Sequence, residues 1–349
     1  MTSKKLIRDH GYVIGELPIG ERNSITDVDG VTVGQTTVIS EKHHTGVTVI
    51  LPAQDNVYLN KVTAASYVLN GFGKTAGLVQ VDELGAIETP IALTNTLCVG
   101  KVWDALVTYT IAQCEKDGLH VTTIDPVVGE TNDSQINDIQ DRAVGEKEVL
   151  EAIANASKDV EQGCVGAGAG TTCCGLKGGI GTSSRRVRIG RETYTVGALV
   201  QSNFGATRHL SIGGELIGPE IAKKVKEAEN DKGSIMMVLA TDAPLSDRQL
   251  KRLLKRAAVG LVHTGSYMGH GSGDVMIGFT TANRIPHQSF DIVEDRKVLR
   301  ENLLDSLFQG AAESVEEAIL NSLAAAEPVR ALDGRMFHAL SEFLELKGN

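Results

Sequence analysis

Hydrophobic and polar positions along the chain predict a mixture of buried strands and amphipathic helices. Residues 234–240 (SIMMVLA) form an uninterrupted apolar run that has the length of a buried strand. Beyond Pro244, Ser246 is a suitable N-cap for a helix. Apolar residues then recur three and four positions apart, which is the spacing of one helical face. They are Leu250, Leu253, Leu254, Ala257, Ala258 and Leu261.

Shorter segments complete this pattern. Apolar and β-branched runs predict strands at 28–38, 46–51, 120–124, 184–189, 193–201 and 275–280. Apolar spacing and composition predict helices at 101–114, 146–157, 219–229 and 304–322. Strands and helices are mixed without a regular βαβ repeat, an internal repeat or a low-complexity linker. We therefore expect one compact α/β domain over residues 1–349.

The composition narrows the function classes. Glycine is abundant, with 38 residues, whereas aromatic residues make up only 4% of the chain and there are 8 prolines. This favours tight turns and close backbone packing over a collagen-like or disordered chain. Asp and Glu total 44 against 34 for Lys and Arg, which gives a net charge of −10. Nucleic-acid binding relies on clustered basic residues, so this chain is a poor candidate for it, and small cationic substrates suit it better.

Cysteine usage and hydropathy indicate a cytoplasmic protein. The 5 cysteines are odd in number and show no CxxC spacing, so we expect reduced and mostly buried thiols. Residues 1–8 are basic, but no apolar run follows them. No stretch of about 18 consecutive apolar residues occurs anywhere in the chain. We therefore expect neither a signal peptide nor a membrane partner, and the cytoplasm is the default compartment.

Residues 163–172 (GCVGAGAGTT) raise the question of a nucleotide site, because glycines let backbone N–H groups approach phosphates. The spacing does not match GxGxxG, and it does not match a P-loop, because Leu176 separates Lys177 from the last glycine. Close approach of the backbone to another layer or to a substrate is the better explanation of these glycines. We expect no cofactor.

The sequence gives little support for a metal site or for a hydrolase with a GxSxG nucleophile elbow. The pair His43 and His44 would point to opposite faces of a strand, the other histidines are scattered, and HExxH is absent. We therefore expect no metal. The tripeptide Gly271-Ser272-Gly273 lacks the GxSxG pattern of a nucleophile elbow, and such a tripeptide commonly forms a turn.

Ser234 has a more unusual setting, because it follows Gly233 at the first position of the apolar strand. This arrangement is compatible with a self-cleaving N-terminal nucleophile hydrolase. Attack of the hydroxyl on the preceding carbonyl, followed by hydrolysis of the ester, would free an amine that can act as a local base. Glycine reduces hindrance at that carbonyl and permits strained φ and ψ. An ordinary strand-opening serine fits the same local pattern, and Gly-Ser also occurs at 265–266 and 271–272.

Motifs spread over nearly the whole chain resemble the DmpA/BapA family, the group of L-aminopeptidase/D-esterases and β-peptidyl aminopeptidases. They are 94–96 (TNT), 126–131 (PVVGET), 177–182 (KGGIGT), 200–205 (VQSNFG), 233–245 (GSIMMVLATDAPL) and 271–274 (GSGD). The resemblance implies an α/β fold with a sandwich of two β-sheets between helical layers. This fold is similar to that of N-terminal nucleophile hydrolases, with different connectivity. The resemblance also implies a precursor that is cut between Gly233 and Ser234 into residues 1–233 and 234–349.

The same resemblance implies roles for individual residues. It makes Ser234 the nucleophile and Asn203 the oxyanion stabiliser, an amide that donates without adding a charge. Ser272 and Asp274 match a hydroxyl and carboxylate pair that orients the new amine and relays protons. Glu130 matches an acid that receives the substrate's free amino group, because a buried ammonium needs a counter-charge. An exposed loop glutamate is the alternative for Glu130.

The implied function is a serine aminopeptidase or amidase that acts through an acyl-enzyme on Ser234. It would release N-terminal α-, β- or D-amino acids from small peptides, amides or esters. The resemblance also implies a homo-oligomer, a tetramer of processed heterodimers. The alternative is an ornithine acetyltransferase-like acyl transferase, although those enzymes use threonine where this chain has Ser234. A nucleotide-binding oxidoreductase and a non-catalytic scaffold rank lower. For Lys177, structural support and a place near the site are equally compatible with the sequence.

Overall fold

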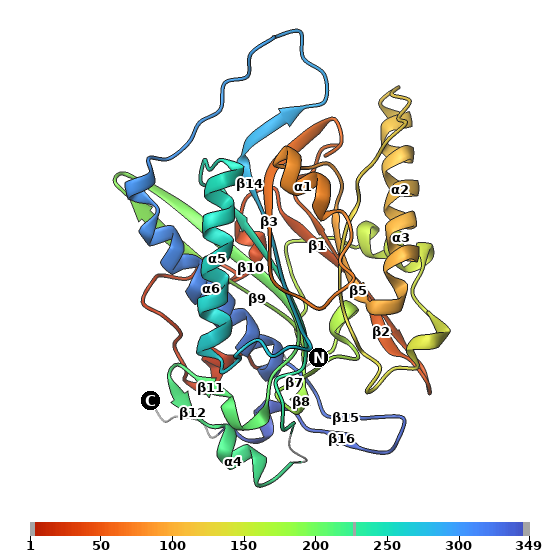
Figure 1. Ribbon diagram of the computed structural model, residues 1–349, viewed down its shortest axis with the longest axis vertical. Helices are drawn as coiled ribbons and strands as arrows, with labels where there is room; N and C mark the ends of the chain where they lie inside the picture. The colour runs from red at the N-terminus through yellow and green to blue at the C-terminus, as the bar shows by residue number, and fades with distance from the viewer. Residues whose placement is uncertain (1–3, 226–227, 345–349) are drawn as a thin grey trace.

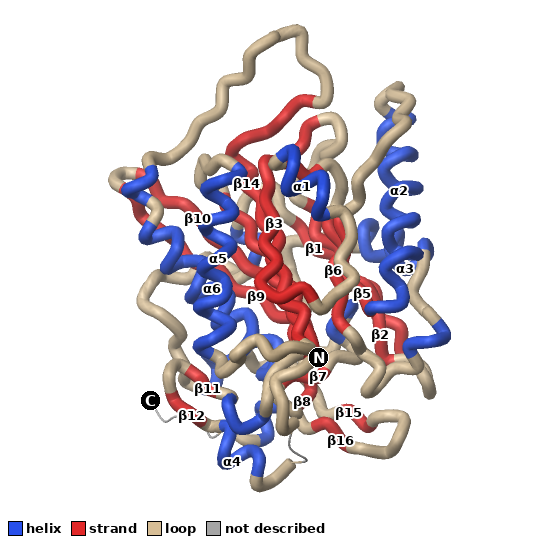
Figure 2. The backbone as a smooth tube through the Cα atoms, viewed as in Figure 1, coloured by secondary structure: helices blue, strands red, loops and turns tan. Residues whose placement is uncertain are grey.

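Two β-sheets lie face to face between layers of helices (Figure 1 and Figure 2). This computed structural model describes residues 4–225 and 228–344. One sheet has six strands in the order β4-β3-β14-β13-β10-β9, and the other has four in the order β1-β2-β5-β6. The arrangement confirms the sandwich of two sheets between helical layers that the sequence predicts.

The six-stranded sheet positions most of the candidate residues. Its strands are β3 (Asn60–Gly71), β4 (Ala86–Ile87), β9 (Gly179–Ile189), β10 (Glu192–Asn203), β13 (Gly233–Thr241) and β14 (Ser272–Pro286). Strands β13 and β14 run parallel at its centre, and the other neighbouring pairs are antiparallel. The apolar run expected at 234–240 is therefore a central strand, with a neighbour on each side.

The four-stranded sheet is shorter. It consists of β1 (Thr32–Ile39), β2 (His44–Leu51), β5 (Ile91–Asn95) and β6 (Val127–Thr131), of which β5 and β6 are parallel. Two-stranded ribbons pair β7 (Thr172–Cys173) with β8 (Leu176–Lys177), β11 (Ser211–Ile212) with β12 (Glu215–Leu216), and β15 (Val329–Arg330) with β16 (Met336–Phe337). The motif at 126–131 thus becomes strand β6 at one edge of this sheet.

Helices cover the outer faces of both sheets. Helices α5 (Asp247–His263) and α6 (Asp305–Ala324) pack on the six-stranded sheet, and α2 (Val99–Lys116) and α3 (Glu146–Ala154) pack on the four-stranded sheet. Shorter helices are α1 (Leu78–Leu84) and α4 (Gly218–Ala222). As expected, Ser246 caps α5, and its hydroxyl accepts a hydrogen bond from the Gln249 N–H at 3.2 Å. Within the described ranges, no helix has both the length and the apolar character needed to cross a membrane.

One expected element is wrong, a second is shorter than expected and a third starts late. Residues 120–124 form a mostly exposed loop, because they have no strand partner and the neighbouring strand, β6, begins at Val127. The helix expected at 219–229 is limited to Gly218–Ala222, because the charged residues that follow give it no continuous apolar face to bury. Positions 226–227 of that segment lie outside the described residues. The strand expected at 28–38 begins only at Thr32, after a turn.

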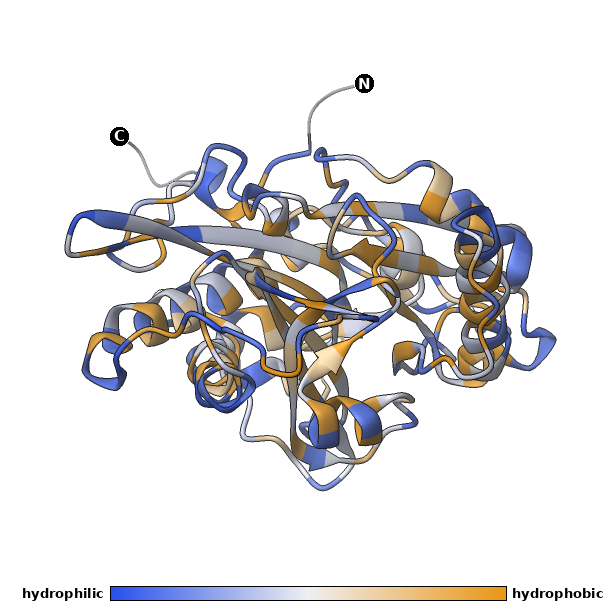
Figure 3. Ribbon diagram, turned by 90° about the horizontal axis from the view of Figure 1, so that it is seen from above, coloured by the Kyte–Doolittle hydropathy of each residue, from blue (hydrophilic) through white to orange (hydrophobic). Residues whose placement is uncertain are grey.

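Alternation along β13 divides the core in two. Met236 and Val238 face the four-stranded sheet, whereas Ile235 and Met237 face α5 and α6. Hydrophilic residues concentrate in loops and on outer helix surfaces (Figure 3). Because both faces of β13 are buried, the strand is apolar at nearly every position instead of alternating with polar residues.

The glycines of residues 163–181 serve close backbone packing. A Cβ built at Gly170 would overlap the carbonyl oxygen of His44 on β2, and one built at Gly181 would overlap that of Ala318 on α6. Only glycine permits this distance between layers. The structural explanation of this segment is confirmed.

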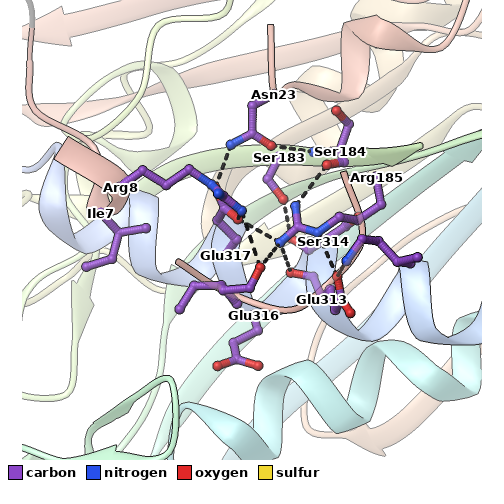
Figure 4. A network of polar contacts seen from close by, with 12 residues as sticks. Ile7, Arg8, Asn23, Ser183, Ser184, Arg185, Glu313, Ser314, Glu316 and Glu317 are labelled. Atoms are coloured by element: carbon purple, nitrogen blue, oxygen red, sulfur yellow. Dashed lines mark hydrogen bonds and ion pairs between the residues drawn. The ribbon is translucent and has the colours of Figure 1, made fainter. Parts of the chain in front are cut away.

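A buried ion network joins β9 and the N-terminal segment to α6 (Figure 4). The fully buried Arg185 donates from Nε to Glu313 Oε2 at 2.9 Å and from a terminal nitrogen to Glu317 Oε2 at 2.6 Å. Arg8 donates to the other Glu317 oxygen at 2.6 Å. Removing one partner would leave a buried charge uncompensated, so these contacts act as a unit.

Candidate active site

Ser234 lies at the start of β13, between two neighbouring strands. It pairs with Asn203, the last residue of β10, and with Gly273 near the start of β14. The residue is 7% exposed, and its Oγ accepts a hydrogen bond from the Gly273 N–H at 3.3 Å. The hydroxyl is therefore held on a rigid element while a narrow opening to solvent remains.

The residue before Ser234 has a backbone that favours glycine. Gly233 has φ +102°, and a Cβ built on it would overlap the carbonyl oxygen of Asn203. Its N–H donates to the Gly271 carbonyl at 3.4 Å. The peptide bond between Gly233 and Ser234 is thus fixed next to the hydroxyl in a conformation that other residues avoid.

The candidate residues occupy two faces of the six-stranded sheet. By alternation from Met236 and Val275, which face the other sheet, the side chains of Ser234 and Asn203 lie on the face between the sheets. Ser272 and Asp274 alternate with Val275 and so lie on the helix-covered face. The Ser234 backbone nitrogen lies in the plane of the sheet, whereas the Ser234 hydroxyl lies on the opposite face from this pair. The pair can therefore approach the nitrogen more directly than it can approach the hydroxyl.

Asn203 is oriented by a backbone donor. The Thr172 N–H donates to its Oδ1 at 3.0 Å, and an N–H can pair only with the amide oxygen. The NH₂ group is consequently directed away from Thr172 and stays available as a donor. The side chain is buried, so a hydrogen bond from this group would form in a low-dielectric environment.

Lys177 supports the segment that carries Thr172. Its fully buried ammonium donates to the carbonyl oxygens of Gly168, Thr171 and Gly178 at 2.9, 2.8 and 2.8 Å. Burial lowers the pKa of Lys177. The structure therefore places this lysine behind Asn203, where its contacts fix the loop before β7.

Ser272 and Asp274 form a buried hydrogen-bonded pair. The Ser272 hydroxyl donates to Asp274 Oδ1 at 2.8 Å, while Oδ2 has no partner among the described residues. Burial raises the pKa of Asp274 to about 6, and the negative charge of Asp231 adds to this rise, whereas the hydrogen bond from Ser272 opposes it. The carboxyl group therefore changes its charge close to neutral pH.

Glu130 is buried on edge strand β6, which excludes the exposed loop alternative. One carboxylate oxygen accepts from the Lys74 N–H at 2.8 Å, and the other accepts from the Thr96 hydroxyl. The loop that provides Lys74 also approaches the nucleophile, because a Cβ built at Gly273 would overlap the carbonyl oxygen of Phe72. Two hydrogen bonds leave the carboxylate with unused acceptor sites that can receive an ammonium.

A cavity of about 500 Å³ opens next to the neighbours of the nucleophile, although Ser234 and Glu130 themselves are not part of its lining. It is bordered by Asn203 and Gly233, by the segment before the nucleophile that includes Asn230 and Lys232, and by the hairpin of β15 and β16. Its size suits a small peptide or aminoacyl amide. In the part of the chain that the structure describes, no group of three or more His, Cys, Asp or Glu side chains has a metal-binding arrangement.

Some contacts of the site had no signal in the sequence. The backbone N–H groups of Thr172 and Lys74 could come from almost any residue, so no residue type marks them. Asp231, which forms several hydrogen bonds just before Gly233, carries no signal in the sequence, because a single aspartate in a polar loop is common. Thr96, in contrast, belongs to the TNT motif at 94–96.

The fold and the site indicate a serine hydrolase, because two stacked sheets lie between helical layers and Ser234 opens a central strand. The sequence model of peptidase family S58 matches residues 23–337. A β-peptidyl aminopeptidase, BapA, of Sphingosinicella microcystinivorans is 38% identical over 94% of this chain and 87% of its own. The chain belongs to peptidase family S58 and is therefore a hydrolase.

Solved structures agree with this assignment. A Pyrococcus horikoshii OT3 protein is 44% identical, with a TM-score of 0.93 and coverage of 98% of both chains. The L-aminopeptidase D-Ala-esterase/amidase of Ochrobactrum anthropi is 35% identical, with a TM-score of 0.91 over 97% of this chain and 96% of its own. That structure is described as a prototype for the serine aminopeptidases and a new variant of the Ntn hydrolase fold.

Proposed function

We propose that this protein is a self-processing serine aminopeptidase that cuts its own backbone between Gly233 and Ser234. The observation that carries the proposal is the position of Ser234, which opens a central strand directly after a glycine with positive φ. A serine at the start of β13 becomes an amino-terminal nucleophile only when the preceding peptide bond is broken. Residues 1–233 and 234–349 then form the two polypeptides of one folded unit.

Self-processing needs no residue from outside the chain. The Ser234 hydroxyl attacks the carbonyl carbon of Gly233, the C–N bond breaks, and the released nitrogen takes a proton, which leaves an ester. Water then hydrolyses that ester, which yields the Gly233 carboxylate and restores the hydroxyl. The positive φ of Gly233 is compatible with this step, because a residue without a Cβ adopts it freely and leaves its carbonyl unhindered.

The processed enzyme would use the new amine as its base. A neutral α-amine, with a reference pKa of about 7.7–8.0, accepts the hydroxyl proton while Ser234 attacks the substrate carbonyl. The proton then passes to the leaving amine, and water hydrolyses the acyl-enzyme. Ser272 and Asp274 lie on the face from which they can orient this amine.

The two remaining residues would recognise the substrate. The free NH₂ group of Asn203 stabilises the oxyanion that forms when Ser234 attacks. Glu130 accepts the substrate ammonium and so restricts the enzyme to free amino termini. The names of the relatives support amino-terminal substrates of β-peptides or L-amino acids, and D-alanyl esters or amides are a further class. Acyl transfer of the ornithine acetyltransferase kind is not favoured, because the functionally named relatives reported above are aminopeptidases.

Glu130→Gln should weaken turnover of free-amine substrates. Losing a charge-assisted hydrogen bond of about 1.5–3 kcal/mol corresponds to roughly 10–100-fold in kcat/KM. The measurement compares β-alanyl-, L-alanyl- and D-alanyl-p-nitroanilide with their N-acetyl forms. Wild type should reject the acetylated substrates, and Glu130→Gln should still cut itself, because self-processing involves no external ammonium.

The matched control for this experiment is Glu88→Gln. Glu88 is also buried and also accepts a backbone N–H, from Asp125 at 2.9 Å, but its ion pair is with Lys61. Its replacement should leave the preference for free amines intact. Equal rates of wild type on capped and free substrates would remove Glu130 from amine recognition and point to a general amidase.

Self-processing should slow as the pH falls through about 6, because burial raises the pKa of Asp274 to about 6. Above that pH the ionised carboxylate stabilises the positive charge that develops on the Ser234 nitrogen, and below it the neutral carboxyl does not. The rate should fall by about tenfold per pH unit on the acid side. Unfolded precursor diluted into buffers of different pH and sampled on denaturing gels gives this profile.

Asp274→Asn should remove this pH dependence and cut slowly at every pH. Asp125→Asn is the control, since burial also raises the pKa of Asp125 to about 6. It should keep the wild-type profile. An unchanged acid limb in Asp274→Asn would assign the limb to another group.

We further propose a cytoplasmic homo-oligomer, a tetramer of processed heterodimers. All five cysteines are free thiols, which suits a reducing compartment. The loop between β14 and α6 protrudes from the body (Figure 1), and its Phe290 and Ile292 are fully exposed. Such apolar side chains favour cover by another copy of the chain.

A further inference from the structure

Asp231 lies two residues before the proposed cut and is only 2% exposed. Its Oδ2 accepts three hydrogen bonds, from the Ser266 hydroxyl at 2.7 Å, the Tyr267 N–H at 2.7 Å and the Met268 N–H at 2.9 Å. Its own N–H donates to the Tyr267 hydroxyl at 3.1 Å. One buried carboxylate thus joins the segment before the nucleophile to the loop after α5.

That loop is shaped around Asp231. Met268 has φ +53°, and a Cβ built at Gly269 would overlap the Asp231 carbonyl oxygen. The loop leads directly into Ser272, so the same contacts define where β14 begins. Non-glycine residues rarely adopt positive φ, and the three hydrogen bonds at Oδ2 offset the strain at Met268.

A second feature distinguishes Asp231 from a simple loop anchor. Its Oδ1 is buried without a partner among the described residues, as is Oδ2 of Asp274. The negative charge of Asp231 raises the pKa of Asp274. The hydrogen bond from Ser272, which lies on β14 with Asp274, lowers that pKa. Asp231 thus acts on the site through its contacts and through its charge.

We propose that Asp231 is a positioning residue for self-processing, which holds the segment before the cut against the loop that supplies Ser272 and Asp274. The inference rests on the proposed self-processing. Only Lys232 and Gly233 separate the anchor from Ser234, and the Gly233 N–H is bound by Gly271 of the same loop. The anchored segment therefore has little freedom to move its last carbonyl away from the hydroxyl.

The anchor also has a consequence for the processed enzyme. Asn230, Lys232 and Gly233 border the cavity beside Asn203. Because Asp231 stays bound to the loop after the cut, Asn230 remains in the wall of that cavity. Only the two residues beyond the anchor, Lys232 and the new carboxyl-terminal Gly233, would be free to move.

Two substitutions separate the contacts from the charge. Asp231→Ala removes all three acceptor contacts and should slow self-processing by roughly 10–100-fold, the effect of losing charge-assisted hydrogen bonds. Asp231→Asn keeps an acceptor oxygen and should restore most of that rate. Without the negative charge, however, the pKa of Asp274 falls, so the acid limb of the Asp231→Asn profile should move to lower pH.

Asp242→Ala is the matched control. Asp242 follows the far end of β13, is partly buried and accepts the Thr195 N–H at 2.7 Å. It should lower the thermal midpoint and leave the rate and pH profile of self-processing unchanged. If Asp231 has a purely structural role, Asp231→Ala will also lower only the thermal midpoint and leave the rate and pH profile unchanged. This outcome would overturn the proposal.

The remaining outcomes also test the role of Asp231. If Asp231→Ala does not fold, Tyr267→Phe removes only the hydroxyl that binds the Asp231 N–H, from a half-exposed side chain. It should slow the cut severalfold, and a wild-type rate would overturn the proposal. An uncut wild type would instead reject self-processing itself, whereas rapid cutting by both wild type and Asp231→Ala rejects only the role of Asp231.

Discussion

Replacing Ser234 with alanine is expected to leave the chain as one uncut polypeptide and to abolish hydrolysis. The side chain supplies the attacking atom of the proposed step, because Oγ lies at the start of β13 beside the peptide bond it would break. Removing the nucleophile of a serine hydrolase typically costs about 10⁶ in kcat. Intact mass and a denaturing gel, with amino-terminal sequencing of any smaller fragment, measure the result.

Ser234→Cys is the matched variant for this experiment. It keeps a nucleophile of similar size at the start of β13 and should still yield fragments 1–233 and 234–349, at a changed rate. Cutting by Ser234→Ala at the wild-type rate would contradict the mechanism, because the alanine has no atom that can form the ester. A wild type that stays intact after long incubation would do the same.

Replacing Asn203 with alanine should lower kcat by roughly 10²–10³, the usual effect of losing one oxyanion donor. The Thr172 N–H already occupies Oδ1, so only the NH₂ group remains to donate. The measurement is kcat on an aminoacyl p-nitroanilide, made with protein that has completed its own cut. KM should change much less, because the interaction forms mainly in the transition state.

Asn203→Asp tests the donor separately from the packing. The aspartate still accepts the Thr172 N–H and fills the same space, but it presents an oxygen where the NH₂ group stood. It should therefore be at least as slow as Asn203→Ala. A kcat near wild type in either variant would show that backbone donors alone stabilise the oxyanion.

Much of the fold could be predicted because its main elements carry local patterns. The apolar run at 234–240 and the helical face that begins at Leu250 correspond to β13 and α5, since burial imposes those patterns directly. Residues 120–124 show the limit of this reasoning. Their β-branched composition is suited to a strand, but no neighbouring strand pairs with them.

The site depended more on resemblance than on local pattern. No periodicity indicates that β13 and β14 run parallel, which sets Ser272 beside Gly233. Nor does a pattern show that β6, with Glu130, lies at a sheet edge near the loop that contains Lys74. Contacts between segments far apart in the sequence require the tertiary structure, and backbone donors carry no residue identity at all.

The central position of β13 and β14 has a further consequence for how the protein can be made. Strand β14 and all of β13 after Gly233 belong to residues 234–349, whereas β3, β4, β9 and β10 of the same sheet belong to residues 1–233. The Arg185 network with Glu313 and Glu317 crosses the same division. After the proposed cut, refolding would change from a search within one chain to an encounter between two. The cut would thus make unfolding effectively irreversible. The sheet assembles once, as a single polypeptide, and two separated fragments would not easily reassemble it.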